Sequence, residues 1–231
     1  ISSVDFQSKP KDPSSYASRM MKAAYYAQVE FVDDAFGQVM KALEESGQLA
    51  NTLVIFTSDH GETMGDHGLT HKGCRFYEGL AHVPLILSWP GKFGGGVRRK
   101  ALAELTDLVP TILEAAGLSQ PGYLHGKSLY PLASDSARAD RLRDFARSEY
   151  HDALDLPGHS HANMLRNDRY KLVHYHGVPS GELFDLERDP DEFQNLWDDP
   201  KHLALRADLS NQLFDAVMLA TDPGQPRIGP M

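Results

Sequence analysis

The chain has 231 residues, of which 41% are hydrophobic and 24% are charged, and its formal net charge at pH 7 is −9. This composition is typical of a globular protein with one or two domains and a real core, and the acidic balance argues against broad binding to nucleic acid or to a membrane surface. The single cysteine, Cys74, excludes an internal disulfide, and no apolar run is long enough to span a bilayer.

A long helix and a short strand are predicted in the first quarter of the chain. Residues 15–46 carry apolar side chains at intervals of three and four, with a serine at residue 14 or 15 as the cap. Residues 52–57 form a short β-branched, apolar run, which favours a strand buried on both faces in a parallel α/β sheet. Because ligands bind at the carboxyl ends of such strands, we expect the polar residues 58–62 to lie at a functional edge.

The next segment continues the α/β pattern. Residues 83–88 are predicted to form the second strand and residues 101–105 a short third one. A helix is expected to follow from a cap at Thr106 or Asp107 and to end at Gly117. Strands that alternate with helices indicate an α/β layer.

The last third of the chain has a different character. Short candidate strands separated by turn residues predict a small antiparallel sheet, at residues 147–150, 162–166, 170–174 and 182–186. A final helix is predicted over residues 201–219. We therefore expect two parts: residues 1–135 in an α/β domain, and residues 136–231 in a C-terminal subdomain with the antiparallel sheet and the terminal helix.

The densest group of reactive side chains follows the first predicted strand. Asp59 and His60 stand at the strand end, where one loop could bring both to a single cation. His71, Lys72 and Arg75 add basic groups a short distance along the chain. A cation and basic side chains in one site would suit an anionic ester, whose charge they would bind.

Each of these residues also has an ordinary structural interpretation. An adjacent Asp59–His60 pair at a strand end is commonly a hydrogen-bonded cap, and a single lysine such as Lys72 is commonly a solvated surface residue. His71 is equally compatible with a site and with plain surface. The functional hypothesis rests on the whole group at its spacing, not on any one member.

The ordered motifs of the chain resemble the sulfatases of the alkaline-phosphatase superfamily. The resemblance covers nearly the whole chain, and its motifs occur in family order: Thr57-Ser58-Asp59-His60-Gly61-Glu62, Gly65-Asp66-His67-Gly68-Leu69, Lys72-Gly73, Phe76-Tyr77-Glu78, Val83-Pro84-Leu85-Ile86, Trp89-Pro90-Gly91, Thr106-Asp107-Leu108-Val109-Pro110-Thr111, Arg166-Asn167-Asp168-Arg169-Tyr170-Lys171-Leu172 and Glu182-Leu183-Phe184-Asp185-Leu186. The fold that it implies is part of an alkaline-phosphatase-like mixed sheet flanked by helices, followed by the small antiparallel sheet and the C-terminal helix.

The resemblance also implies roles for particular residues. Asp59 and His60 match the pair that binds a divalent cation, with Ca²⁺ expected and Mn²⁺ as the alternative. Lys72 matches the lysine that contacts the sulfate and takes part in catalysis, with His71 and Arg75 as further substrate contacts. The family's nucleophile is a formylglycine made in a Cys-x-Pro-x-Arg segment, upstream of the metal pair. Cys74 does not match that segment, because Arg75-Phe76-Tyr77-Glu78 follows it.

The absence of this segment leaves three interpretations open. The chain could pair with an N-terminal half of the same enzyme, it could be part of a longer protein, or it could be an inactive remnant. Two ligands do not hold calcium, which takes six to eight oxygen atoms, so we expect the chain to be inactive alone. The start at Ile1 is compatible with truncation or with cleavage of a signal. A periplasmic or secreted location is favoured, and a cytoplasmic one stays open.

The predicted function is metal-dependent hydrolysis of sulfate esters on a sulfated small molecule or glycan. In this hypothesis the chain supplies the metal ligands and the sulfate-contacting lysine but not the nucleophile. One alternative is a phosphonate monoester hydrolase or phosphodiesterase of the same superfamily, for which His60 would suit manganese. The other is a non-catalytic fragment that binds a partner chain.

Overall fold

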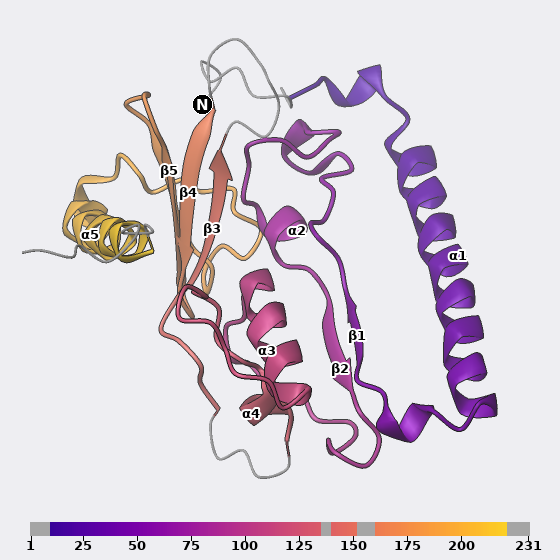
Figure 1. The fold of residues 1–231 in the computed structure, drawn as a ribbon. Coiled ribbons are helices and arrows are strands. Elements are labelled where there is room, and N and C mark those ends of the chain that lie inside the picture. Colours follow the sequence, from indigo (N-terminus) through magenta and orange to yellow (C-terminus); the bar gives the residue numbers. More distant parts are fainter. Residues whose placement is uncertain (1–9, 135–139, 152–159, 221–231) are drawn as a thin grey trace, which may run out of the picture.

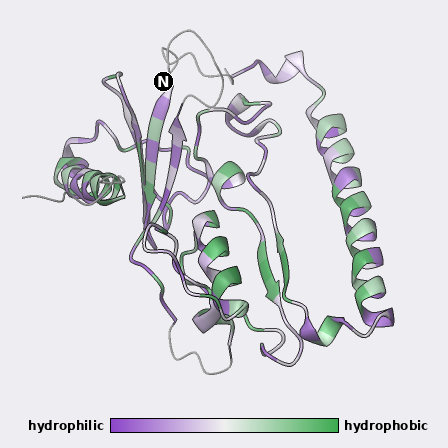
Figure 2. Ribbon diagram, in the orientation of Figure 1, coloured by the Kyte–Doolittle hydropathy of each residue, from purple (hydrophilic) through white to green (hydrophobic). Residues whose placement is uncertain are grey.

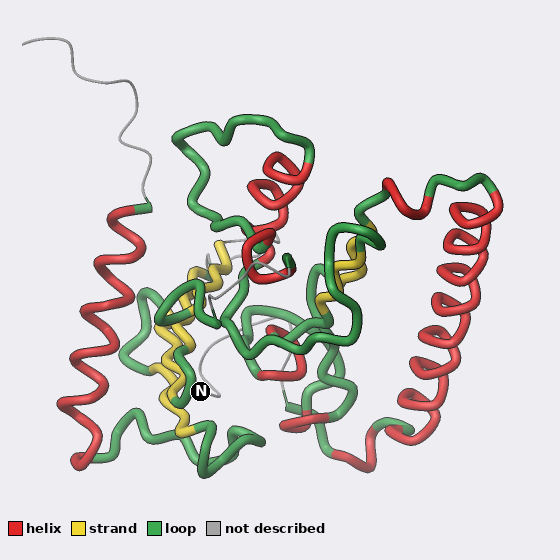
Figure 3. Tube along the Cα trace, turned by 90° about the horizontal axis from the view of Figure 1, so that it is seen from below, coloured by secondary structure: helices red, strands yellow, loops and turns green. Residues whose placement is uncertain are grey.

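The computed structural model describes residues 10–134, 140–151 and 160–220. Helices α1 and α5 lie on opposite outer sides of the molecule, with a two-stranded and a four-stranded sheet between them, and the view turned by 90° shows the same order (Figures 1 and 3). The predicted α/β class, with its small antiparallel sheet and C-terminal helix, is confirmed. The predicted boundary at residues 135 and 136 lies outside the described residues, so the division into two domains stays a prediction.

Helix α1 (Ser18–Glu45) confirms the predicted first helix. The predicted serine cap is wrong: Pro13–Ser15 form a short 3₁₀ helix, η1, which Asp12 caps, and α1 begins without a side-chain cap. Gly47 follows the helix in the left-handed region at φ 70°, a conformation that glycine adopts at little cost. No residue of α1 is buried, and its Phe36 ring meets Phe56 at a centroid distance of 5.3 Å.

Strands β1 (Val54–Thr57) and β2 (Leu85–Ser88) form the two-stranded sheet. They pair antiparallel, so the expectation of a parallel arrangement is wrong for this pair. Their residues are half-buried rather than buried on both faces, and Ile86 is 57% exposed. The predicted strand at residues 101–105 is absent from the structure, because that segment leads into the 3₁₀ helix η4.

Short helices surround this sheet. They are the 3₁₀ helices η2 (Leu49–Asn51), η3 (Asp66–Gly68) and η4 (Leu105–Asp107), and the α-helices α2 (Glu78–Ala81), α3 (Leu108–Ala115) and α4 (Tyr130–Ala133). The predicted start of this helix is confirmed, because Asp107 directly precedes α3 as its N-cap residue. The fully buried Asp107 carboxylate accepts hydrogen bonds from the backbone of Glu104 and Lys127 and pairs with Arg143, so it ties α3 to two later segments.

The four-stranded sheet confirms the predicted C-terminal strands to within a residue or two at each end. Its strands run in sequence order and each pairs antiparallel with the next: β3 (Ala146–His151), β4 (His161–Arg166), β5 (Tyr170–Tyr175) and β6 (Gly181–Asp185). Strands β4 to β6 are almost entirely buried, which requires cover on both faces of the sheet.

One face of this sheet packs against α5 (Leu203–Leu219), which follows the 3₁₀ helix η5 (Pro200–His202). The apolar cluster on that face comprises Leu165, Leu172, Leu183, Trp197, Leu209 and Leu213. On α5, Leu209 and Leu213 are buried, whereas Leu203 is 46% exposed. No helix in the described ranges has the length and apolar character that crossing a bilayer requires.

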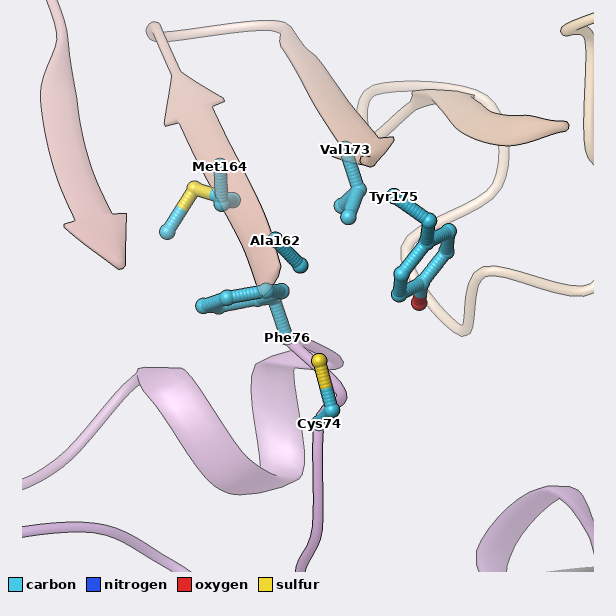
Figure 4. Close-up of a cluster of buried hydrophobic side chains, with 6 residues drawn as sticks. All are labelled: Cys74, Phe76, Ala162, Met164, Val173 and Tyr175. Atoms are coloured by element: carbon cyan, nitrogen blue, oxygen red, sulfur yellow. The ribbon is translucent and has the colours of Figure 1, made fainter. Parts of the chain in front are cut away.

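The other face packs against the segment that follows the predicted site. Cys74 and Phe76 enter a buried apolar cluster with Ala162, Met164, Val173 and Tyr175 of β4 and β5 (Figure 4). The four-stranded sheet is therefore a middle layer, with α5 on one side and residues 74–78 on the other.

Gly181 provides a test of this packing, because a Cβ there would overlap the Trp197 ring and approach the carbonyl oxygen of Val173. We expect Gly181→Ala to lower the free energy of unfolding by about 1–3 kcal/mol, as overpacking of a closed core does. Gly95→Ala is the matched control, since nothing lies within 4 Å of that Cβ position, and its effect should stay within about 0.5 kcal/mol. Urea unfolding of both variants measures the difference, and equal stabilities would contradict the packing described here.

Candidate functional site

The chain changes from strand to loop directly before Asp59 and His60. Strand β1 ends at Thr57, and the Ser58 hydroxyl donates a hydrogen bond of 2.8 Å to the carbonyl oxygen of His60. The amide of His60 donates to Asp59 Oδ1 at 2.9 Å, and this bond, with the nearby imidazole, lowers the pKa of the carboxyl group. The side chains of Asp59 and His60 are 83% and 39% exposed, so both are open to a ligand.

Lys72 meets His60 at this strand end. Its Nζ lies 2.8 Å from His60 Nε2, while His60 Nδ1 lies 2.8 Å from the carbonyl oxygen of Gly61. A carbonyl only accepts, so Nδ1 carries the proton and Nε2 accepts from the ammonium. Asp59 Oδ2 is 3.5 Å from the same Nε2 atom. The structure thus brings together the three residues to which the sequence assigned metal binding and sulfate contact.

The other two predicted substrate contacts lie in different surroundings. His71 is exposed beside Lys72, and its carbonyl oxygen accepts a hydrogen bond of 2.9 Å from the Thr63 hydroxyl. The Arg75 side chain is only 5% exposed, and its Nη1 lies 3.4 Å from the Tyr175 hydroxyl and 3.8 Å from Glu182 Oε1. The Arg75 guanidinium therefore contacts the four-stranded sheet.

Cys74 is buried. Its side chain belongs to the apolar cluster on the sheet, and burial raises the pKa of its thiol to about 12. A thiol with so high a pKa is hardly ionised at neutral pH, and the thiolate is the reactive form. Cys74 has a packing role.

The donor set at the strand end does not by itself fit a calcium ion. Asp59 and His60 provide one carboxylate and one imidazole, and the described ranges contain no group of three or more His, Cys, Asp or Glu side chains placed to hold a metal. Calcium takes six to eight oxygen ligands. A cation on His60 Nε2 would also have to displace the Lys72 ammonium from that atom. Further ligands are needed to complete such a site.

The loop from Gly61 to Gly73 is held at several points. The amide of Gly61 donates to the carbonyl oxygen of Leu80 at 2.8 Å, and a Cβ at Gly61 would overlap the carbonyl oxygen of Gly79. Further along, the His67 ring stacks on Tyr77 with centroids 3.9 Å apart. The strand end and the loop are thereby attached to α2 and to the residue before it.

Two buried polar groups, which the sequence did not identify, connect this region to the four-stranded sheet. In the first, Lys171 Nζ of β5 lies 2.6 Å from Glu78 Oε1 and 2.7 Å from Glu192 Oε1, and it donates to the carbonyl oxygen of Phe76 at 2.8 Å. Burial opposes ionisation of Glu78, but the charge of Lys171 outweighs it and lowers the pKa of that carboxyl.

The second buried group is centred on Glu182 of β6. Its carboxylate accepts hydrogen bonds from the hydroxyls of Tyr77, at 3.3 Å, and Tyr175, at 3.0 Å, and it lies near Arg75. Burial raises the pKa of Glu182 and also those of both tyrosines. The available signal was the presence of Tyr77, Glu78, Lys171 and Glu182 within the family-like motifs, but nothing in the sequence shows that they meet.

Comparison with known proteins identifies the family. Residues 65–218 match the family described as N-sulphoglucosamine sulphohydrolase, C-terminal, and residues 4–118 match the family described as Sulfatase. An arylsulfatase from Clostridium perfringens is 36% identical over 183 residues, which are 78% of this chain and 36% of the relative. An N-acetylglucosamine-6-O-sulfatase from Bacteroides thetaiotaomicron is 31% identical over 75% of this chain and 31% of the relative.

The fold is also found in solved structures. The phosphonate monoester hydrolase of Agrobacterium radiobacter superposes with a TM-score of 0.78 and 31% identity, over 87% of this chain and 42% of that one. The chain thus spans about a third to two fifths of the length of the proteins that it resembles.

Because the pKa of Glu182 is raised, the free energy of unfolding should depend on the protonation of this residue. The folded protein holds this proton more tightly than the unfolded chain, so the associated stability is present at low pH and is lost as the pH rises through the folded pKa. Relative to wild type, Glu182→Gln should therefore gain stability between about pH 4 and pH 8. Melting temperatures across this range measure the trend. Glu114→Gln, at an exposed position on α3, should show no such trend, and a pH-independent difference for Glu182→Gln would contradict the prediction.

Proposed function

We propose that the chain forms part of an enzyme that hydrolyses sulfate esters. The chain belongs to the sulfatase family of the alkaline-phosphatase superfamily and matches the C-terminal portion of its members. The observation that carries the proposal is the meeting of Asp59, His60 and Lys72 at the open end of β1. A carboxylate, an imidazole and an ammonium at one exposed point suit a site for a cation and a tetrahedral anion.

In this proposal each residue of the group has a separate task. Asp59 and His60 are two of the ligands of a divalent cation, which would supply positive charge against the oxygen atoms of the ester. Lys72 binds a sulfate oxygen and stabilises the charge that develops as the ester bond breaks. His71, exposed beside Lys72, is a second candidate contact for the anion. Arg75 is the weakest of the predicted contacts, since its guanidinium is buried against Glu182.

The remaining parts of the site are proposed to come from other segments of a longer polypeptide. These are the formylglycine nucleophile, since the 231 residues hold no Cys-x-Pro-x-Arg segment, and the other metal ligands. Figure 2 shows hydrophobic residues along α1 and α3. Exposed apolar side chains on these helices include Met20, Phe31, Val39, Val109 and Ile112. Their exposure supports a further part of the same enzyme as the partner that covers them.

The substrate class is proposed from the relatives. One similar protein is an arylsulfatase and another an N-acetylglucosamine-6-O-sulfatase, so a sulfated aryl compound or a sulfated sugar is the first choice. The similarity to a phosphonate monoester hydrolase supports a second candidate, hydrolysis of phosphonate monoesters or phosphate diesters. The cation would be calcium in the first case, and manganese, which imidazole binds well, in the second.

The direct test is turnover by the complete gene product, with an aryl sulfate and an aryl phosphate diester as substrates. We expect the sulfate ester to give the higher kcat/KM, and Lys72→Ala to lower its kcat on the order of 10²-fold, because the ammonium counts most as charge develops. Lys41→Ala is the control, since Lys41 is 73% exposed and pairs with Glu45 on α1. A preference for the diester would replace the first candidate by the second, and an unaffected Lys72→Ala variant would remove Lys72 from the site.

A second expectation concerns residues 1–231 expressed alone. With one carboxylate and one imidazole at the strand end, this polypeptide should bind calcium only weakly and should not turn over an aryl sulfate. Isothermal calorimetry with Ca²⁺ and an assay of the same sample measure both properties. Tight calcium binding or clear turnover would contradict the proposal that ligands and nucleophile come from elsewhere.

A further inference from the structure

We propose that Lys171, on the four-stranded sheet, is a positioning residue that fixes the place of His60, and through it the geometry of His60 and Lys72. This inference rests on the proposed function for its catalytic consequence, but its structural part stands on contacts alone. Lys171 touches none of the three site residues in any contact described above and acts through α2.

The ammonium group of Lys171 is held in a fixed position by its neighbours, which is the first step in its connection to His60. The Lys171 side chain is 1% exposed and has three oxygen partners within 2.8 Å: Glu78, Glu192 and the carbonyl oxygen of Phe76. The Phe76 carbonyl oxygen accepts a hydrogen bond from the ammonium, and the two carboxylates lie at ion-pair distance from it. The ammonium is therefore enclosed by two opposite charges and one acceptor, and the sheet that carries it is packed on its other face by α5.

The second step leads from Lys171 to α2. Glu78 is the first residue of α2, and its backbone amide donates a hydrogen bond of 2.6 Å to Glu192 Oε2. Lys171 pairs with the side chains of both glutamates. It therefore fixes the start of this four-residue helix in two ways: directly through the Glu78 side chain, and through Glu192, which accepts from the Glu78 backbone amide. A helix this short has little stability of its own and takes its place from such tertiary contacts.

The third step leads from α2 to the site. The Gly61 amide donates to the carbonyl oxygen of Leu80 in α2, and Gly61 packs so closely on Gly79 that no Cβ would fit. Gly61 follows His60 in the chain, and the Gly61 carbonyl oxygen accepts a hydrogen bond from His60 Nδ1. A shift of α2 is thus transmitted to the backbone and to the ring of His60, whose Nε2 contacts Lys72.

The chemistry at Lys171 favours positioning over simple stabilisation. Removing an ammonium and its carboxylate partners from water is unfavourable, and well-packed apolar side chains in their place are often as stable. What the charged group supplies is placement, because the ammonium meets Glu78, Glu192 and the Phe76 carbonyl oxygen together only while α2 keeps its position. Apolar packing such as that of Phe76 on Met164 is less sensitive to small shifts.

The experiment compares Lys171→Met with Leu213→Ala in the complete gene product. Leu213 of α5 is buried on the opposite face of the same sheet, so its truncation loosens the sheet without touching Glu78 or α2. Glu78→Gln is the second variant in case Lys171→Met does not fold, since Glu78 is 26% exposed and tolerates a neutral isostere better. Hydrogen exchange at residues 58–72 and 203–219, and kcat and KM for the aryl sulfate, are measured for each variant.

We expect Lys171→Met to accelerate exchange at residues 58–72 and to lower kcat by about 10- to 10²-fold with little change in KM, as loss of alignment does. Glu78→Gln should act in the same direction but less. Leu213→Ala should accelerate exchange at residues 203–219 and leave kcat within about threefold. The positioning role is overturned if Lys171→Met matches Leu213→Ala in kcat and leaves exchange at residues 58–72 unchanged. If wild type hydrolyses neither ester, the proposed function fails, while the exchange pattern still decides the role of Lys171.

Discussion

The contact of residues 74–78 with one face of the four-stranded sheet is the constraint on which the site depends. These residues directly follow the loop that carries Lys72, and the last of them, Glu78, begins the short helix α2 that holds Gly61. The apolar part of the contact, Cys74 and Phe76, removes surface from water and has little directional preference. The polar part, Glu78 with Lys171 and Tyr77 with Glu182, has one satisfied arrangement. The burial of apolar surface keeps the two layers together, and the polar contacts fix how the layers are aligned.

This arrangement explains why the sheet has no polar outer face of the usual kind. An antiparallel sheet commonly alternates buried and solvated residues, but β5 and β6 are covered on both sides, so Lys171 and Glu182 are buried as completely as their apolar neighbours. A buried charge requires a partner of opposite sign or a shifted pKa. Lys171 has two carboxylates, whereas Glu182, with Arg75 farther away at 3.8 Å and two tyrosine hydroxyls, has a raised pKa.

The sequence predicted local features better than pairings. Residues 162–166 and 170–174 were predicted as strands because turn residues separate these short runs, and the meeting of Asp59 and His60 with Lys72 followed from position and family motif. The direction of β1 relative to β2 was wrong, because pairing depends on residues far apart in the chain. Arg75 was predicted to contact the substrate because its charge is visible in the sequence, whereas its burial is not. Lys171 was missed for the same reason, since a lysine in a strand suggests a solvated position.

The groups of this chain that we propose to bind the anion do not distinguish the two proposed reactions. A sulfate monoester, a phosphate diester and a phosphonate monoester are all tetrahedral and each carries one negative charge at neutral pH. A single ammonium such as Lys72 acts as a point charge and gains about the same interaction with each of them. This equality agrees with the similarity of the chain to arylsulfatases and to a phosphonate monoester hydrolase at nearly the same identity, 36% and 31%. Under the proposed function, selection between the reactions would therefore come from the groups that contact the esterified alcohol and from the cation and nucleophile. His60, Lys72 and the buried contacts behind them would serve both reactions alike.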